Sequence, residues 1–275
     1  MAVDVLSAER FIYSSARLLD RHRTAVLLHD ASTGPALAAL AAYRNADGGY
    51  GHALEPDARG PESETTATLH ALEVLEELGA LDGALADVSA WVASVTAPDG
   101  GVPFVLPAAA NYPLAPWMVN GGGSHLTFGF AALLTSAAAS DWCWRRLERA
   151  GELQGYWLKY ALDFLDRTPG DGRAAEVIET IRPLLRPDGS VPVEGGTAYE
   201  KLTALTLSPR PAARSRVLFT DDQISVGLDD LEAAQHGDGG WTFDWAAWAP
   251  GQASEWRGLV TLRALQLLHA HGRLG

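Results

Sequence analysis

The chain has 275 residues, of which 47% are hydrophobic and 20% are charged, and its formal net charge is −13. This composition provides for a large core and excludes a disordered chain. The negative charge argues against nucleic acid or an anionic membrane as a partner. Cys143 is the one cysteine, so no disulfide can form within the chain. The N-terminus lacks the pattern of a signal peptide and no apolar run is long enough to span a bilayer, so we expect a cytoplasmic protein of unknown oligomeric state.

The first half of the chain reads as helices separated by glycine and proline. Apolar spacing predicts one long helix over residues 7–30 and a second over 33–45. Residues 51–61 are expected to form a loop. Further helices are predicted at 62–79, where Gly79 provides the stop, and at 83–96.

The second half begins with a proline-rich connection over residues 99–123, and an irregular segment of that length is often functional. Residues 197–205 are compatible with a helix, and no convincing strand pattern is found. The fold class predicted is therefore all-α, as a single domain over residues 1–275. The remaining predicted helices span 125–139, 141–150, 152–167, 171–185, 221–235 and 254–271.

An internal repeat organises the chain. Asp-Gly turns begin at Asp47, Asp99, Asp188 and Asp238. The first and last turns are followed by two matching thirteen-residue segments, 69–81 and 262–274, which share six identical positions. Leucines at helical spacing give each segment one apolar face, which a lone helical hairpin cannot bury. Several stacked hairpins are therefore predicted.

The last repeat carries a recognisable pattern. Gly227, Leu231, Gln235, Gly240 and Trp241 follow the spacing G-x3-L-x3-Q-x4-G-W. This pattern resembles the repeat signature of squalene–hopene cyclases, the related class II terpene cyclases and the protein prenyltransferase β subunits. A degenerate copy lies in the first half.

The resemblance covers residues 36–81 and 227–274 well and two other turns weakly. It implies a single α/α toroid, a barrel of roughly six helical hairpins, possibly incomplete, around an aromatic-lined apolar cavity. It is specific for the fold and says much less about activity, because one fold hosts many activities. The chain has room for one such barrel.

An acidic motif lies where class II terpene cyclases carry their proton donor. The resemblance matches Glu62-Ser63-Glu64-Thr65-Thr66 to their Asp-x-Asp-Thr-Thr motif, with Glu64 as donor and with Glu62 and Asp57 as its polar support. An ungapped comparison from the turn places Ser63 at the donor position instead. The alternative is that both glutamates are solvated acids in the first turn of a helix.

Aromatic residues and one histidine are the candidates for substrate binding. Aromatic faces stabilise cations and also line apolar pockets, although tryptophans at repeat turns also serve as core. The histidine could orient an acid, hold a metal or form surface hydrogen bonds. The candidates are His52, Tyr50, Trp117, Trp241, Phe243, Trp245, Trp248 and Trp256.

Neither a metal site nor a cofactor is predicted. Asp141 and Cys143 resemble the zinc pair of protein prenyltransferases, but the expected Tyr-His of the last repeat reads Trp256-Arg257 here. No aspartate-rich magnesium motif and no phosphate-binding glycine loop with a lysine are found.

The favoured function is that of a class II terpene-cyclase-like enzyme, an isomerase or lyase that acts on an isoprenoid or other polyene after protonation. The first alternative is a non-catalytic toroid that binds an apolar ligand or a protein partner. The second is a different enzyme chemistry in the same cavity, with His52 or His125 taking part.

Overall fold

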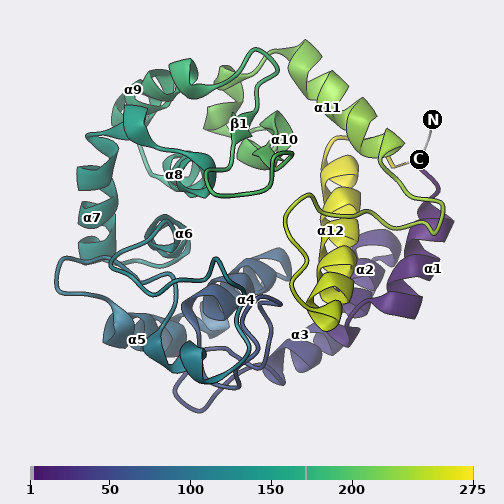
Figure 1. The fold of residues 1–275 in the computed structure, drawn as a ribbon, viewed down its shortest axis with the longest axis horizontal. Coiled ribbons are helices and arrows are strands. Elements are labelled where there is room, and N and C mark those ends of the chain that lie inside the picture. The colour runs from purple at the N-terminus through teal and green to yellow at the C-terminus, as the bar shows by residue number, and fades with distance from the viewer. Residues whose placement is uncertain (1–2, 171, 275) are drawn as a thin grey trace. The chain divides into compact units, whose positions relative to one another are not determined.

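The structure is a computed structural model that describes residues 3–170 and 172–274, and its fold is all-α (Figure 1). Two compact units are present. The terminal unit combines Met1–Ser32 with Arg149–Gly275, and the middle unit comprises Thr33–Glu148. The prediction of one domain over the whole chain stays a prediction. No helix within the described ranges is long and apolar enough to cross a membrane.

The middle unit contains five α-helices among the described residues. The elements in chain order are α3 (Gly34–Ala41), α4 (Thr65–Glu77), the 3-10 helix η1 (Leu81–Gly83), α5 (Leu85–Val95), η2 (Pro107–Asn111), α6 (Leu126–Leu133) and α7 (Ala137–Leu147). Helix α4 packs against α6, and α6 packs against α7. These helices match the predicted ones closely, except that the predicted helix over 125–139 ends earlier, because Ser136 begins α7 by accepting the Ala139 N–H.

The terminal unit is built from both ends of the chain, and α12 packs beside α1 and α2 (Figure 1). Its helices are α1 (Val5–Ser15), α2 (Leu18–His29), η3 (Ala150–Glu152), α8 (Gly155–Arg167), α9 (Gly172–Ile181), η4 (Arg182–Leu184), α10 (Ala204–Leu207), η5 (Arg214–Leu218), α11 (Asp221–Ala233) and α12 (Pro250–Ala270). A two-stranded antiparallel pair joins β1 (Val191–Pro192) to β2 (Lys201–Leu202).

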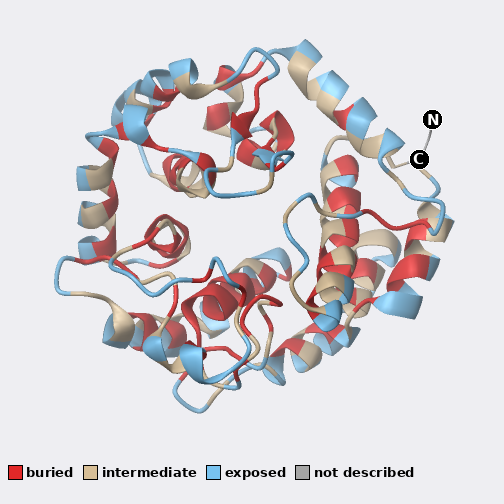
Figure 2. Cartoon of the chain, viewed as in Figure 1, coloured by how far each residue is buried: buried red, intermediate tan, exposed pale blue. Residues whose placement is uncertain are grey.

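Burial separates inner from outer helices within each unit (Figure 2). Ten of the thirteen residues of α4 are buried. In α11, by contrast, Leu228 is the one buried residue. The leucines of α12 pack with Phe11 and Ile12 of α1 in one apolar core. The leucine-rich segments of the repeat therefore form the inner helices, as their spacing predicts.

The four Asp-Gly turns share one geometry. The glycine after each aspartate has a positive φ, between 75° and 93°. Each aspartate Oδ1 accepts the backbone N–H two residues later, at 2.9 to 3.1 Å. Such a conformation suits glycine, because a Cβ would be strained there. The sequence repeat is therefore a structural repeat.

Three of the four turns, those of Gly48, Gly100 and Gly239, rest on the backbone of a neighbouring helix, whereas Gly189 of the third turn faces side chains. A Cβ on Gly239 would lie 2.2 Å from the Ser7 carbonyl oxygen in α1, and one on Gly48 would lie 2.8 Å from the Asp87 carbonyl oxygen in α5. The residue after the turn is tied to the inner helix: the Trp241 N–H donates to Thr261 Oγ1 at 2.9 Å. The Tyr50 N–H donates in the same way to Thr68 Oγ1, at 3.0 Å.

The prediction of one helix over 7–30 is wrong. The chain leaves helical geometry at Ala16 and Arg17, where ψ is 163° and 156°. The cause is a close approach from α12, since a Cβ on Gly258 would lie 2.8 Å from the Ala16 Cβ. Beyond the break, the buried Asp20 accepts from Arg17 Nε at 2.7 Å, which stabilises the start of α2.

The helix suggested over 197–205 is also wrong. Val191 pairs with Leu202, and Gly195 has a positive φ of 77° in the loop that joins the two strands. The Glu200 side chain folds back into this loop, where its Oε2 accepts the Thr197 N–H at 3.4 Å. Only the four residues of α10 are helical here.

Candidate acid site

Glu64 is the residue immediately before α4. Its φ and ψ are −123° and 149°, so the backbone is extended and the helix begins three residues later than predicted. The Glu64 N–H donates to the Tyr50 carbonyl at 2.8 Å, and the Glu64 carbonyl accepts the Thr68 N–H at 2.8 Å. The Asp-Gly turn and the inner helix thus both hold the backbone of this glutamate.

The Glu64 carboxyl is buried and only partly hydrogen-bonded. The residue is 3% exposed. Its Oε2 accepts the Leu106 N–H at 3.1 Å. Its Oε1 is buried and has no hydrogen-bond partner among the described residues. One oxygen is therefore held by the protein, and the other is available to carry a proton.

Burial raises the pKa of Glu64 to about 7, because desolvation penalises the carboxylate. The backbone N–H groups of Leu106 and Thr65 oppose this shift, and the charge of Glu62 adds to it. Near neutral pH, Glu64 therefore keeps a proton far more readily than an ordinary glutamate does, and the protonated form is the one that a general acid needs. The alternative of a solvated acid in the first helical turn does not describe the Glu64 side chain in this structure.

A strap of residues 103–118 covers Glu64. It supplies the Leu106 N–H, and its Phe104 carbonyl accepts the Thr65 hydroxyl at 2.7 Å. The strap is fastened to the loop after the first turn, since the Arg59 N–H donates to the Pro113 carbonyl at 3.1 Å. The proline-rich connection noted in the sequence therefore contacts Glu64 and Thr65 through its backbone.

Glu62 lies beside the acid but reaches the surface. The residue is half-buried, and its Oε2 is buried without a hydrogen-bond partner among the described residues. The Glu62 carboxylate beside Tyr112 of the strap raises the pKa of the Tyr112 hydroxyl. Glu62 also lines an open pocket of about 370 Å³ together with Asn45, Asp47, Pro61 and Ser63.

Asp57 belongs to the same loop and is 6% exposed. Its carbonyl accepts the Ala115 N–H at 2.9 Å, so its backbone helps to fasten the strap. A second acid of this loop, Glu55, places its Oε2 3.9 Å from Nδ1 of the buried His70 on α4. The motif therefore lies among further acidic side chains of the middle unit.

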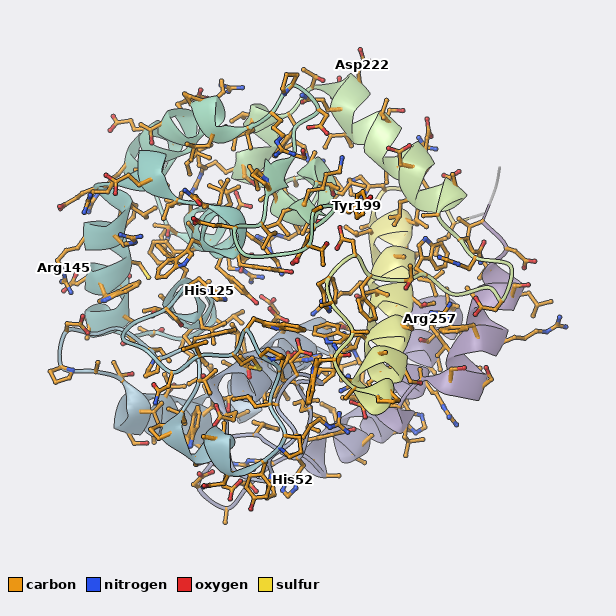
Figure 3. The ribbon with its side chains drawn as sticks, in the orientation of Figure 1. His52, His125, Arg145, Tyr199, Asp222 and Arg257 are labelled. Atoms are coloured by element: carbon orange, nitrogen blue, oxygen red, sulfur yellow. The ribbon has the colours of Figure 1, made fainter. Side chains whose placement is uncertain are left out.

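The other predicted binding residues of the middle unit differ in exposure. His52 is exposed, has a positive φ of 56° and shares a hydrogen bond of 3.0 Å between its Nε2 and Asn45 Oδ1 (Figure 3). Tyr50 is 3% exposed and follows the turn, whereas Trp117 of the strap is 38% exposed. Their contact with a substrate stays a prediction.

Three aromatic rings of the terminal unit form a cluster with one stacked pair and one edge-on pair. The Phe243 and Trp245 rings lie 4.8 Å apart and the Trp245 and Trp256 rings 4.9 Å apart, between centroids. Trp241 is core, since it is 3% exposed and donates its Nε1–H to the Leu231 carbonyl at 2.7 Å. Trp248 is half-buried. Substrate binding by this cluster also stays a prediction.

Cys143 is a buried residue of α7, and burial raises the pKa of its thiol. This environment favours the thiol over the thiolate that zinc binds. Within residues 3–170 and 172–274, no group of three or more His, Cys, Asp and Glu side chains is arranged to hold a metal ion. The Asp141–Cys143 pair therefore has no further ligand beside it among the described residues.

The Leu106 amide is the functional group that the sequence could not reveal. Any residue other than proline supplies a backbone N–H, so its contact with Glu64 across 42 positions leaves no signal in residue type. Tyr112 was recognisable as an aromatic residue of the long connection, but its contact with Glu62 depends on how the strap folds.

The fold matches solved structures of a type II terpene cyclase. MstE from Scytonema superposes with a TM-score of 0.58 over 98% of both chains, at 14% sequence identity. A variant of MstE in complex with its substrate, geranylgeranyl dihydroxybenzoate, gives 0.60 over 97% of both chains at 14% identity. Another, in complex with the product merosterolic acid A, gives 0.55 over 96% of both chains, again at 14% identity.

The chain has the fold of a type II terpene cyclase. The resemblance stated from the repeat signature is thereby confirmed at the level of fold. The sequence matches no protein-family model and no curated protein. At this identity the likeness establishes the fold alone, so the activity has to be argued from the site.

Proposed function

We propose that this chain is a class II terpene-cyclase-like enzyme in which Glu64 protonates an isoprenoid or other polyene. The observation that carries the proposal is the state of the Glu64 carboxyl. It is 3% exposed, its Oε1 lacks a partner, and its pKa is raised to about 7 by burial. A buried acid that is protonated near neutral pH can initiate such a reaction.

The proton balance of the reaction is simple. The O–H bond at Glu64 breaks, the electron pair of a substrate double bond forms the new C–H bond, and a carbocation remains. Ring closure moves the cation along the chain, and a water molecule then takes a proton from a neighbouring carbon, whose C–H electron pair forms the new double bond. The substrate is therefore isomerised, and Glu64 is left as a carboxylate.

The Leu106 N–H has a specific role in this step. It already donates to Glu64 Oε2 at 3.1 Å before the proton leaves. A charged acceptor strengthens a hydrogen bond, so this amide stabilises the carboxylate as it forms. The Asp57 carbonyl fastens the strap that presents the amide, and we assign Asp57 and Glu62 positioning roles.

The proposed substrate class is an isoprenoid chain, free or attached to a polar group. The support is the fold likeness to MstE, whose structures contain geranylgeranyl dihydroxybenzoate. The rings of Phe243, Trp245 and Trp256 are of the kind that stabilises cations, which fits the same chemistry.

The test is to incubate the protein in D₂O with linear isoprenoid alcohols, their diphosphates and prenylated dihydroxybenzoates, and to analyse the products by mass spectrometry. We expect a cyclised isomer that carries one deuterium at the protonated carbon. Glu64→Gln keeps the size of the side chain but cannot donate the proton, so turnover should fall by about 10² to 10⁴.

Equal turnover in Glu64→Gln would exclude this residue as the acid. Tight binding of the isoprenoids without any product in the wild type would instead favour the non-catalytic binding protein. Circular dichroism of both proteins checks that the substitution leaves the fold intact.

A further inference from the structure

Two hydrogen bonds join the start of α4 to the strap. The Leu106 N–H donates to Glu64 Oε2 at 3.1 Å, and the Thr65 hydroxyl donates to the Phe104 carbonyl at 2.7 Å. Consecutive residues of α4 and its cap are thus tied to strap residues that lie two positions apart. Val105 between them is 1% exposed, so the linking backbone is packed and the two bonds depend on each other.

Thr65 holds its end of this arrangement firmly. The residue is 0% exposed, so its hydroxyl cannot exchange the Phe104 carbonyl for water. The Phe104 ring has an anchor of its own, since its centroid lies 5.0 Å from that of the His125 ring. His125 directly precedes α6, and α6 packs against α4. Phe104 is therefore held by its carbonyl at one helix and by its ring beside another.

The repeat scaffold does not need a hydroxyl at this position. Thr65 stands three residues before Thr68, the threonine that accepts the N–H of the residue after the first turn. Three residues before Thr261, its counterpart in the last repeat, stands Gly258. The last inner helix forms without any side chain there. The Thr65 hydroxyl therefore serves the strap and not the shared backbone of the repeats.

We propose that Thr65 is a positioning residue for the acid, because its hydroxyl holds the Phe104 carbonyl and thereby places the Leu106 amide on Glu64. Thr65 acts through the strap and does not touch the reacting carbon. Its effect on turnover rests on the function proposed above, whereas its effect on the Glu64 carboxyl does not.

The direction of the effect follows from the hydrogen bond that is lost. The Leu106 N–H stabilises the carboxylate and opposes the rise in the Glu64 pKa that burial causes. Without this bond, burial and the charge of Glu62 act with less opposition, and the pKa rises further. Glu62 and the Glu55–His70 pair are the same in wild type and in a Thr65 variant, so they do not contribute to the difference.

The experiment follows the protonated carboxyl of Glu64 by infrared difference spectroscopy, with each protein compared against the same protein carrying Glu64→Gln. Thr65→Val keeps the side-chain shape but removes the donor to Phe104. Its Glu64 midpoint should lie about one pH unit above the wild-type value of about 7. With an isoprenoid substrate, kcat should fall by about 3- to 10-fold, and the alkaline limb of the pH profile should move upward with the midpoint.

Three variants control for a merely structural effect. Thr65→Ser keeps the hydroxyl and should restore both the midpoint and the rate. Thr65→Ala removes the donor and favours the helix, so the test stands if Thr65→Val folds poorly. Thr261→Val also removes a hydrogen bond from a buried threonine, but in the terminal unit, and it should lower stability without moving the Glu64 midpoint.

Leu106→Pro tests whether Thr65 acts through the strap amide. The φ of Leu106 is −85°, close to the value that proline fixes, so the substitution removes the N–H with little change in the backbone. It should raise the Glu64 midpoint as Thr65→Val does, and the double variant should shift the midpoint no further.

Two results would overturn this role while leaving the proposed function in place. The first is a wild-type midpoint in folded Thr65→Val, because the amide would then be placed without the hydroxyl. The second is a double variant whose shift is the sum of the two single shifts, because Thr65 would then act on Glu64 by another route. A raised midpoint in a protein whose wild type yields no deuterated cyclised product would instead contradict the proposed function alone.

Discussion

The first and last Asp-Gly turns share a scaffold but differ at one decisive position. In both, the residue after the turn donates its N–H to a threonine of the inner helix, Thr68 in one repeat and Thr261 in the other. Four residues before that threonine stands Glu64 in the first repeat and Arg257 in the last. The repeat therefore determines the backbone position, whereas the side chain at that position differs between the two repeats.

The two side chains at this position have opposite environments. Glu64 is 3% exposed and its carboxyl has one oxygen without a partner. Arg257 instead pairs with the turn aspartate, with Nη1 at 2.9 Å from Asp238 Oδ2 and Nη2 at 3.0 Å from Asp238 Oδ1. In the first turn, the Asp47 carboxylate accepts hydrogen bonds from Trp91 and Ser63. The Glu64 side chain does not pair with it and is buried instead.

The largest effect is expected from the glycine of the turn. Gly239→Ala places a Cβ 2.2 Å from the Ser7 carbonyl at a φ of 90°, and Gly48→Ala places one 2.8 Å from the Asp87 carbonyl. We expect Gly239→Ala to lower the free energy of unfolding by roughly 3 kcal/mol or more, and Gly48→Ala by somewhat less. Denaturant unfolding measures both.

Gly79→Ala is the control, because its φ is also positive, at 66°, but no atom lies within 4 Å of the added Cβ. Its cost should be about 1 to 2 kcal/mol, the strain of the backbone alone. Equal losses in the three variants would contradict the packing of the turns on the outer helices.

The second prediction concerns the pH dependence of stability. The folded pKa of Glu64, about 7, lies above its ordinary value of 4.5, so the folded state binds this proton more tightly. The stability that this provides is fully present below pH 4.5 and is lost as the pH rises through 7. It amounts to about 3 kcal/mol.

Glu64→Gln lacks this titration. The difference in free energy of unfolding between wild type and Glu64→Gln should therefore shrink by about 3 kcal/mol between pH 4.5 and 8. Arg257→Gln serves as the comparison at the matching repeat position, and its difference from wild type should stay constant over this range. A constant difference for Glu64→Gln would show that its carboxyl titrates normally.

The smallest predicted effect tests the shared scaffold. Thr68→Val and Thr261→Val keep the side-chain shape but leave the buried N–H of Tyr50 or Trp241 without an acceptor. Each substitution should lower the free energy of unfolding by about 1 to 3 kcal/mol, and the loss should be similar in the two repeats. Thr180→Val, on an exposed face of α9, should change stability by less than about 0.5 kcal/mol. A loss in only one repeat would mean that the turns are held differently.

The predictions that the structure confirms rest on local sequence patterns. The leucine spacing of 69–81 and 262–274 indicated inner helices, and the Asp-Gly pairs indicated equivalent turns. Glu64 could be chosen as the acid because a known motif could be matched to this sequence. Its burial could not be predicted, since that depends on a strap more than forty residues away.

Contacts between residues far apart in the sequence explain the two elements that were predicted wrongly. The break between α1 and α2 depends on the close approach of Gly258 to Ala16, and periodicity within residues 7–30 carries no trace of it. The β1–β2 pair depends on a loop closed by the Glu200 side chain. In both places tertiary packing overrides local helix propensity.

The protonation of Glu64 tests the central claim most directly. Infrared difference spectra between wild type and Glu64→Gln isolate the carbonyl stretch of this one protonated carboxyl, and its intensity can be followed from pH 4 to 9. A buried acid poised to donate a proton should titrate with a midpoint of about 7. A midpoint near the ordinary value of 4.5 would show a solvated carboxylate and would contradict the assignment of Glu64 as the acid.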